Sequence, residues 1–158
     1  MGQRLWLTGE EDRAWRAYRR MKVLLDAQLA RDLVDGSGLS EPDYDVLSNL
    51  SEIEGERWRI TELAARMQWS KSRLSHHLDR MEQRGLVRRE ECRTDGRGAF
   101  VVLTAGGRRA IEQAAPGHVA SVREHFIDQL TARERECLTT IAEKVMRHLG
   151  EPLPLSQR

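Results

Sequence analysis

The stretch from Ile60 to Val87 constrains the fold of this chain more than any other part of the sequence. It contains two short runs of helical periodicity, separated by a tight turn at residues 68–70 and followed by Gly85, which suits a left-handed C-terminal cap. The apolar positions of the first run are Leu63, Ala64 and Met67, and those of the second are Leu74, Leu78 and Met81. Two short helices joined by a turn of three or four residues predict a helix-turn-helix.

The second of these helices, expected over about residues 71–84, has a polar and basic side opposite its apolar stripe. That side carries Lys71, Ser72, Arg73, Ser75, His76 and Arg80. All six are hydrogen-bond donors, and a recognition helix brings its N-terminal residues to base edges in the major groove. We therefore predict that they bind double-stranded DNA, with the solvated face of an ordinary amphipathic helix as the alternative interpretation.

Two runs of β-formers, residues 86–92 and 99–103, follow the second helix directly. Between them lies a charged, turn-rich tip, in which Gly96 and Gly98 flank Arg97. This pattern predicts a β-hairpin, called the wing below, whose apical arginine can enter the minor groove. Residues 58–60 are expected to be short and extended.

Positive charge is concentrated in this part of the chain. The 158 residues carry a formal net charge of only +1, but residues 66–98 contain nine Lys or Arg against five Asp or Glu. A DNA-binding protein of balanced composition must gather its basic residues in this way. With 39% apolar and 32% charged residues, the chain is slightly poor in core-forming residues, so long helices that bury a face against a second subunit would fit it.

Further helices are expected on both sides of the wing. Capping boxes at Thr8, Ser40 and Thr131 predict helices over about residues 8–34, 40–54 and 131–149. Another should start at Thr104 and continue to about residue 129, with a kink or restart at Pro116. The predicted fold class is therefore mainly α with a small β-wing, a winged helix-turn-helix.

The stretch from about residue 60 to residue 106 resembles the MarR family of bacterial transcription regulators. The run Asp95-Gly96-Arg97, followed by Val102-Leu103-Thr104 and Gly106, is similar to the wing signature of that family. Trp69, in the turn, and the pair His76-His77 depart from the family pattern; we expect Trp69 to pack against the core or face a phosphate.

The resemblance implies one domain over residues 1–158, with dimerisation helices at about 8–34 and 104–149 and a winged helix-turn-helix at about 41–103. It implies a homodimer that reads a pseudo-palindromic operator, with repression as the family default and a small molecule as effector. In such a protein Asp95 orients the wing by contacting a nearby basic group, and Arg97 inserts into the minor groove. A plain turn residue is the alternative role for Asp95.

An effector site can be sought among the aromatic residues of the predicted helices. Family members often bind small phenolic or aromatic compounds between the dimer helices and the DNA-binding lobe. Trp15, Tyr18, Arg19, Tyr44 and Trp58 are the candidates here, because an aromatic wall with one cation suits an anionic aromatic ligand. The favoured alternative is that these aromatics are dimer core.

Other functions have weaker support in the sequence. A redox switch would use Cys92 or Cys137, of which Cys137 is expected to be partly buried, and a metal switch would use His118 and His125. No zinc-ligand spacing, phosphate loop or nucleophile motif occurs, so we predict no metal, no cofactor and no enzyme activity. A winged-helix protein-interaction module remains an alternative. The cysteine usage and the absence of an apolar span or signal peptide predict a cytoplasmic protein.

Overall fold

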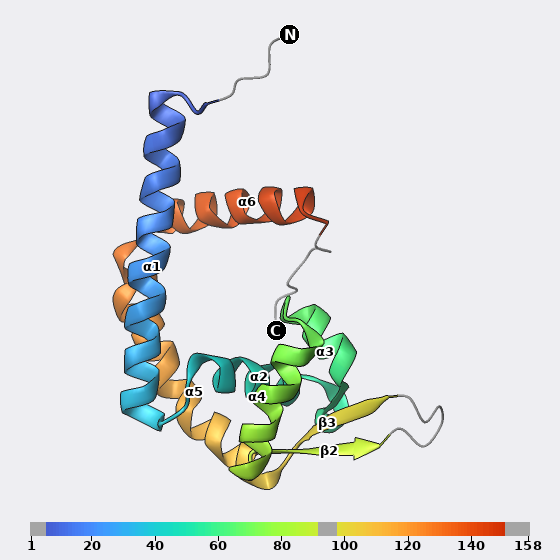
Figure 1. Cartoon of the computed structure of the whole chain (residues 1–158). Helices are drawn as coiled ribbons and strands as arrows, with labels where there is room; N and C mark the ends of the chain where they lie inside the picture. The colour runs from blue at the N-terminus through green and yellow to red at the C-terminus, as the bar shows by residue number, and fades with distance from the viewer. Residues whose placement is uncertain (1–5, 92–97, 151–158) are drawn as a thin grey trace. The chain divides into compact units, whose positions relative to one another are not determined.

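The computed structural model describes residues 6–91 and 98–150 of the chain (Figure 1). It divides into two compact units, Met1–Val119 and Ala120–Arg158, which are described in turn below. The described part is mainly helical with one small antiparallel sheet, which confirms the predicted fold class. The wing tip at residues 92–97, including the predicted site residues Asp95 and Arg97 as well as Cys92, lies outside the described residues.

The first unit begins with two helices whose ends follow local capping rules. Helix α1 (Gly9–Ser37) starts at the Thr8 capping box, with the Thr8 backbone N–H donating to Glu11 at 2.7 Å, and ends at Gly38 with φ 72°. It ends three residues later than predicted. Helix α2 (Glu41–Glu52) starts at a second capping box formed by Ser40 and Asp43.

The predicted helix-turn-helix is present as α3 (Ile60–Arg66) and α4 (Lys71–Gln83). Gln68 makes the turn with a positive φ of 54°, and Ser70 caps α4 by accepting a hydrogen bond from the Arg73 backbone N–H at 3.1 Å. Gly85 has φ 71°, as a left-handed C-terminal cap requires. The sequence pattern therefore placed this motif correctly.

The sheet has three strands, one more than the wing alone supplies. Strands β2 (Val87–Glu91) and β3 (Ala99–Leu103) form the predicted hairpin, and β1 (Arg57–Arg59) pairs antiparallel with β3. The strand order is β1-β3-β2, so β3 is central, and a short 3₁₀ turn (Glu54–Glu56) leads into β1. Because β1 precedes α3 and β3 belongs to the wing, this pairing fixes the wing base to the helix-turn-helix.

One apolar core joins α2, α3, α4 and the sheet. Its fully buried members include Leu47, Leu50, Leu63, Leu74, Leu78, Met81 and Val101. The apolar stripe of α4 therefore points inward as predicted, which leaves the opposite side of this helix for solvent or a partner.

Helix α5 (Ala105–His125) corrects one expectation. It runs as a single helix through Pro116 with no restart, and it ends four residues earlier than predicted, before a 3₁₀ turn (Ile127–Gln129). Its start is packed tightly against the end of the helix-turn-helix. Thr104 Oγ1 donates to the carbonyl oxygens of Gly85 and Leu86 at 2.6 and 3.0 Å, and the Gly107 N–H donates to Thr104 Oγ1 at 3.0 Å.

The second unit contains the end of α5 and α6 (Ala132–His148). A capping box between Thr131 and Glu134 starts α6, as predicted. Its apolar stripe is exposed, with Ile141, Val145 and Leu149 at 61%, 51% and 75% of full exposure. Cys137, expected to be partly buried, is exposed. In the part of the chain that the structure describes, no helix has the length and apolar character needed to cross a membrane.

Candidate nucleic-acid interface

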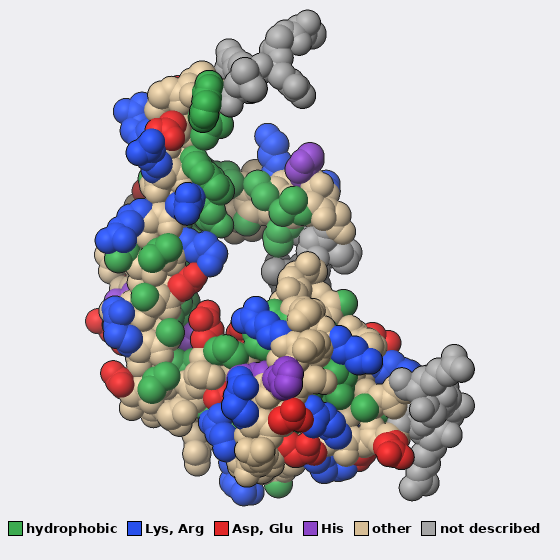
Figure 2. All heavy atoms as spheres, viewed as in Figure 1, with side chains coloured by type: hydrophobic (Ala, Val, Ile, Leu, Met, Phe, Trp, Pro, Cys, Tyr) green, Lys and Arg blue, Asp and Glu red, His purple; other side chains and the backbone are tan. Residues whose placement is uncertain are grey.

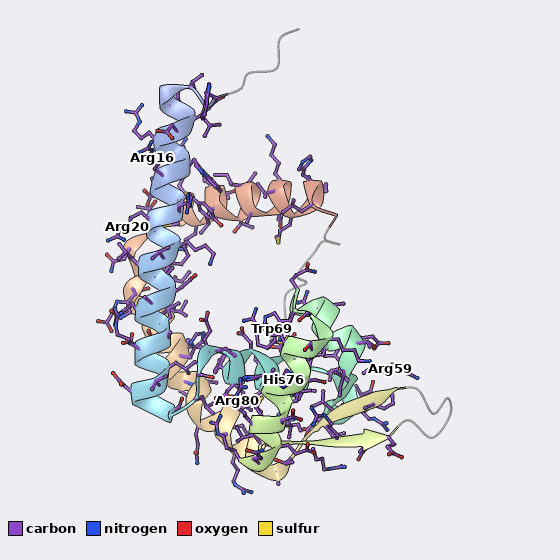
Figure 3. All side chains as sticks on the ribbon, in the orientation of Figure 1. Arg16, Arg20, Arg59, Trp69, His76 and Arg80 are labelled. Atoms are coloured by element: carbon purple, nitrogen blue, oxygen red, sulfur yellow. The ribbon has the colours of Figure 1, made fainter. Side chains whose placement is uncertain are left out.

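The outward side of α4 gathers the six helix residues that the sequence singled out. Lys71, Ser72, Arg73, His76 and Arg80 are exposed and Ser75 is partly buried, whereas Leu74, His77, Leu78 and Met81 are buried on the other side. Figure 3 shows His76 and Arg80 along this helix, with Trp69 at its start. In the space-filling view of Figure 2, Lys and Arg side chains lie over this part of the molecule together with His, Asp and Glu side chains.

The N-terminus of α4 is suited to negative charge. Its first turn holds Lys71 and Arg73 and no acidic residue, and the free N–H groups of a helix start add a partial positive charge. Backbone N–H groups and basic side chains in this arrangement can bind a phosphate. The helix start can therefore contact a DNA backbone while the following residues reach the bases.

Arg73 stacks on the turn residue Trp69. Its guanidinium carbon lies 3.9 Å from the centre of the Trp69 ring, which is cation–π distance. Trp69 packs against the core cluster and is partly buried, so the sequence-based expectation of packing is correct.

A buried ionic cluster connects α2 to the core side of α4. Asp43 is 2% exposed and accepts a hydrogen bond from Arg84 Nη1 at 2.8 Å. His77 Nε2 lies 3.1 Å from Asp43 Oδ1, within ion-pair distance but outside hydrogen-bond geometry. Arg80 Nη2 donates to His77 Nδ1 at 2.9 Å, which leaves the imidazole proton on Nε2, facing Asp43.

This cluster shifts the pKa values of both buried groups. Burial lowers the pKa of His77 most, and the nearby Arg80 and Arg84 lower it further, although Asp43 opposes them. Burial alone would raise the pKa of Asp43, but hydrogen bonds from Arg84 and Ser40 outweigh it and hold that pKa below its ordinary value. His77 is therefore neutral and Asp43 ionised near neutral pH.

Arg89 on β2 binds the exposed side of α4. Its Nη1 donates to Asp79 at 2.6 Å and to Glu82 at 3.1 Å, and its Nη2 donates to the Ser75 carbonyl oxygen at 2.8 Å. The Arg89 backbone N–H also donates to Glu82 at 2.9 Å. These contacts hold the wing base against the helix that carries the predicted base-contacting residues.

Comparison with known proteins identifies the family of this chain. Residues 37–98 match the sequence pattern of the MarR family. The transcriptional regulator HosA of Escherichia coli is 35% identical over 133 residues, which are 83% of this chain and 95% of HosA. AbsC, a MarR family transcriptional regulator from Streptomyces coelicolor, is 46% identical and superposes with a TM-score of 0.87 over 92% of this chain and 98% of AbsC. This chain belongs to the MarR family.

A second solved relative extends the comparison to a DNA complex. Sco3205, a MarR family transcriptional regulator from Streptomyces coelicolor, was solved in complex with DNA. It is 39% identical to this chain, with a TM-score of 0.89 over 94% of this chain and 93% of Sco3205. The chain is accordingly a MarR-family transcription regulator with a DNA-binding winged helix-turn-helix.

The predicted effector residues of this MarR-family protein lie in separate places. Trp15 and Tyr18 stack on α1 with ring centres 5.9 Å apart, and Arg19 lies over Trp15 at 5.9 Å. Tyr44 of α2 packs instead on His118 of α5 at 4.3 Å, and Trp58 of β1 packs against the core. Within one protomer these contacts therefore bring together Trp15, Tyr18 and Arg19, but not Tyr44 or Trp58.

The remaining candidates form no metal cluster. No group of three or more His, Cys, Asp or Glu among residues 6–91 and 98–150 is arranged to hold an ion. His118 contacts Tyr44 through its ring, and its Nδ1 is buried without a hydrogen-bond partner.

Sequence reasoning missed Asp43, His77, Arg84 and Arg89 as parts of the interface. His77 carried a signal, because it lies beside Leu74, Leu78 and Met81 in the apolar stripe.

Proposed function

We propose that this protein is a homodimeric repressor that binds a pseudo-palindromic operator through two copies of α4. The observation that carries the proposal is the division of α4 into a buried apolar side and an exposed side of donors, Lys71, Ser72, Arg73, Ser75, His76 and Arg80. The N-terminal residues of such a helix are the ones that reach base edges. At the wing tip, Asp95 would orient the hairpin and Arg97 would enter the minor groove.

The homodimer is supported by exposed apolar side chains on the two terminal helices. On α1, Trp15, Tyr18 and Leu24 are each about half exposed, and Ile141 of α6 and Leu149 at its C-terminal cap are more exposed still. A stripe of this kind is costly to leave in water and is typical of a subunit interface. We infer that residues 1–158 work as one domain, with about 8–34 and 104–149 pairing in the dimer, in the cytoplasm.

The same proposal includes release from DNA by a small aromatic effector. Trp15 and Tyr18 expose half of their surface as a stacked pair beside the Arg19 cation, and this combination suits an aromatic carboxylate. Tyr44 and Trp58 are the further candidates. Binding that changes the spacing of the two lobes would prevent both copies of α4 from reaching their half-sites.

The test is selection from a random duplex library followed by stoichiometry. The purified protein should enrich an inverted repeat with half-sites about one helical turn apart and bind two protomers per site. Affinity should fall steeply with salt, because phosphate contacts release counterions. Enrichment of no sequence, or binding of one protomer to an asymmetric site, would overturn the proposal. A panel of aromatic carboxylates added to the same assay tests effector release.

A further inference from the structure

The side chain of Trp69 is held in place before any DNA is bound. Its backbone N–H donates to the Ala64 carbonyl oxygen at 2.9 Å, and Gln68 before it makes the turn. Its ring meets the His77 ring edge-on, with centres 5.7 Å apart and planes at 86°. His77 is fixed in turn by Arg80 and by the buried Asp43. The indole therefore packs against a polar cluster that extends to Asp43 of α2.

Arg73 lies on the face of this ring. Arginine has several rotatable bonds, and an unrestrained exposed arginine loses that freedom when it binds a ligand. Stacking at 3.9 Å restricts the guanidinium while its N–H edge stays available for hydrogen bonds. Among the described residues, no carboxylate is paired with Arg73, in contrast to Arg84 and Arg89. Trp69 is thus the side chain that sets where this cation points.

We propose that Trp69 is a positioning residue that pre-orients Arg73 for base recognition, so that sequence preference depends on a residue that reads no base itself. This inference rests on the proposed function, because it requires that Arg73 contacts the operator. A bidentate arginine pair with guanine depends on the plane of the guanidinium. Loss of the stack should therefore reduce discrimination among bases more than it reduces attraction to phosphates.

The experiment measures binding of the full chain to its selected operator and to duplexes in which each half-site base pair is replaced. Trp69→Tyr, Trp69→Phe and Trp69→Leu are compared with the wild type and with Arg73→Ala. We expect Trp69→Leu to weaken operator binding about two- to five-fold. It should also flatten preference at the same base pairs as Arg73→Ala. Base discrimination should decline in the order Trp, Tyr, Phe, Leu.

A double substitution separates positioning from general packing. In Trp69→Leu/Arg73→Ala the effects should not add, because the stack has already been lost. Additive effects, or a Trp69→Leu loss that is equal on every duplex, would overturn the inference. If Trp69→Leu does not fold, the Tyr and Phe variants, which keep an aromatic ring against His77, provide the same comparison.

The outcomes distinguish this inference from the proposed function. If Arg73→Ala flattens base preference and the Trp69 variants do not, only the positioning role is wrong. If the wild type has no base preference, or Arg73→Ala leaves it intact, the assignment of Arg73 as a reader fails and the role of Trp69 fails with it.

Discussion

The Nη1 atom of Arg89 donates to Oδ1 of Asp79 at 2.6 Å, and this contact joins the wing base to α4, the helix that carries the proposed DNA contacts. Arg89 is 27% exposed and also binds Glu82 and the Ser75 carbonyl oxygen. Because the Arg89 guanidinium binds this many protein groups, we assign it a structural role. It therefore holds the wing base against α4, which the proposed binding of these two elements in neighbouring grooves requires.

Replacement of Arg89 should loosen the wing. We expect Arg89→Ala to lower the free energy of unfolding by about 1–2 kcal/mol, since several hydrogen bonds to charged groups are lost. Operator affinity should fall as well, because the wing is no longer pre-oriented. Arg88→Ala is the matched control, since Arg88 pairs with Glu90 of its own strand and is half exposed. Thermal unfolding and operator titration of both variants measure these effects. Equal losses of stability and operator affinity in the Arg89→Ala and Arg88→Ala variants would contradict this role of Arg89.

Stability should depend on pH through His77 and Asp43. The pKa of His77 is lowered in the folded chain by its burial, so the unfolded chain takes up a proton near pH 6.5 while the folded chain resists it. Stability is therefore fully present above about pH 6.5 and is lost as the pH falls toward the lowered pKa of His77. Asp43, whose pKa is also lowered, adds a second loss below its ordinary value of 3.8.

The variant His77→Gln isolates the first of these two losses. It should be less stable than the wild type at pH 7.5 but should lose less further stability between pH 7.5 and 5.5, because the titrating group is gone. Denaturant unfolding at several pH values measures this. The exposed His76, its neighbour on α4, provides the matched control His76→Gln, a histidine replacement outside the buried cluster. A His77→Gln slope equal to the wild type would contradict the account.

Gly107 allows α5 to begin directly against the helix-turn-helix. A Cβ at this position would lie 2.0 Å from the Leu86 carbonyl oxygen, which is backbone and already bonded to Thr104. We expect Gly107→Ala to cost about 1–3 kcal/mol or more of stability through this clash. Gly117→Ala in the same helix meets nothing within 4 Å and should stabilise by about 0.5–1 kcal/mol. Calorimetry of the Gly107→Ala and Gly117→Ala variants measures this. Similar unfolding midpoints for the two variants would contradict the close approach of α5 to the Leu86 carbonyl oxygen.

The exposed stripe of α6 should control assembly. Ile141→Lys places a charge in the apolar stripe, and we expect dimers to dissociate at micromolar concentration because that charge would be buried in the interface. Thr140→Lys, at the exposed neighbouring position, should leave the dimer intact. Sedimentation of both variants across a range of concentrations measures this. A dimeric Ile141→Lys protein would remove α6 from the proposed interface.

The elements that the sequence predicted are those governed by local rules. Thr8, Ser40 and Thr131 each cap a helix through a partner three residues on, and Gly85 ends α4 through its own backbone preference. The apolar stripe of α4 must face the core, so the sequence also predicted which residues of this helix are exposed on the opposite side. The expected restart at Pro116 was wrong, because a proline can remain inside a continuous helix, as it does in α5.

The contacts that sequence reasoning missed join residues far apart in the chain. The capping box predicted at Ser40 accounts for only one contact of Asp43, whose other contacts are with Arg84, 41 residues away, and with His77. Arg89 was counted as part of a basic region, although pairing of β2 with β3 places it against the acidic residues of α4. Such partners are set by tertiary packing, and no local pattern of residue types encodes them.

Binding of the selected operator by Arg73→Ala and Arg97→Ala over a range of salt concentrations tests the central claim most directly. Arg16→Ala serves as the control, because Arg16 lies on α1 and pairs with Asp12. We predict that Arg97→Ala weakens binding broadly and reduces the salt dependence. Arg73→Ala should cost about 1–3 kcal/mol and relax base preference. If both variants keep the affinity, salt dependence and base preference of the wild type, the assignment of the operator contacts to α4 and the wing is contradicted.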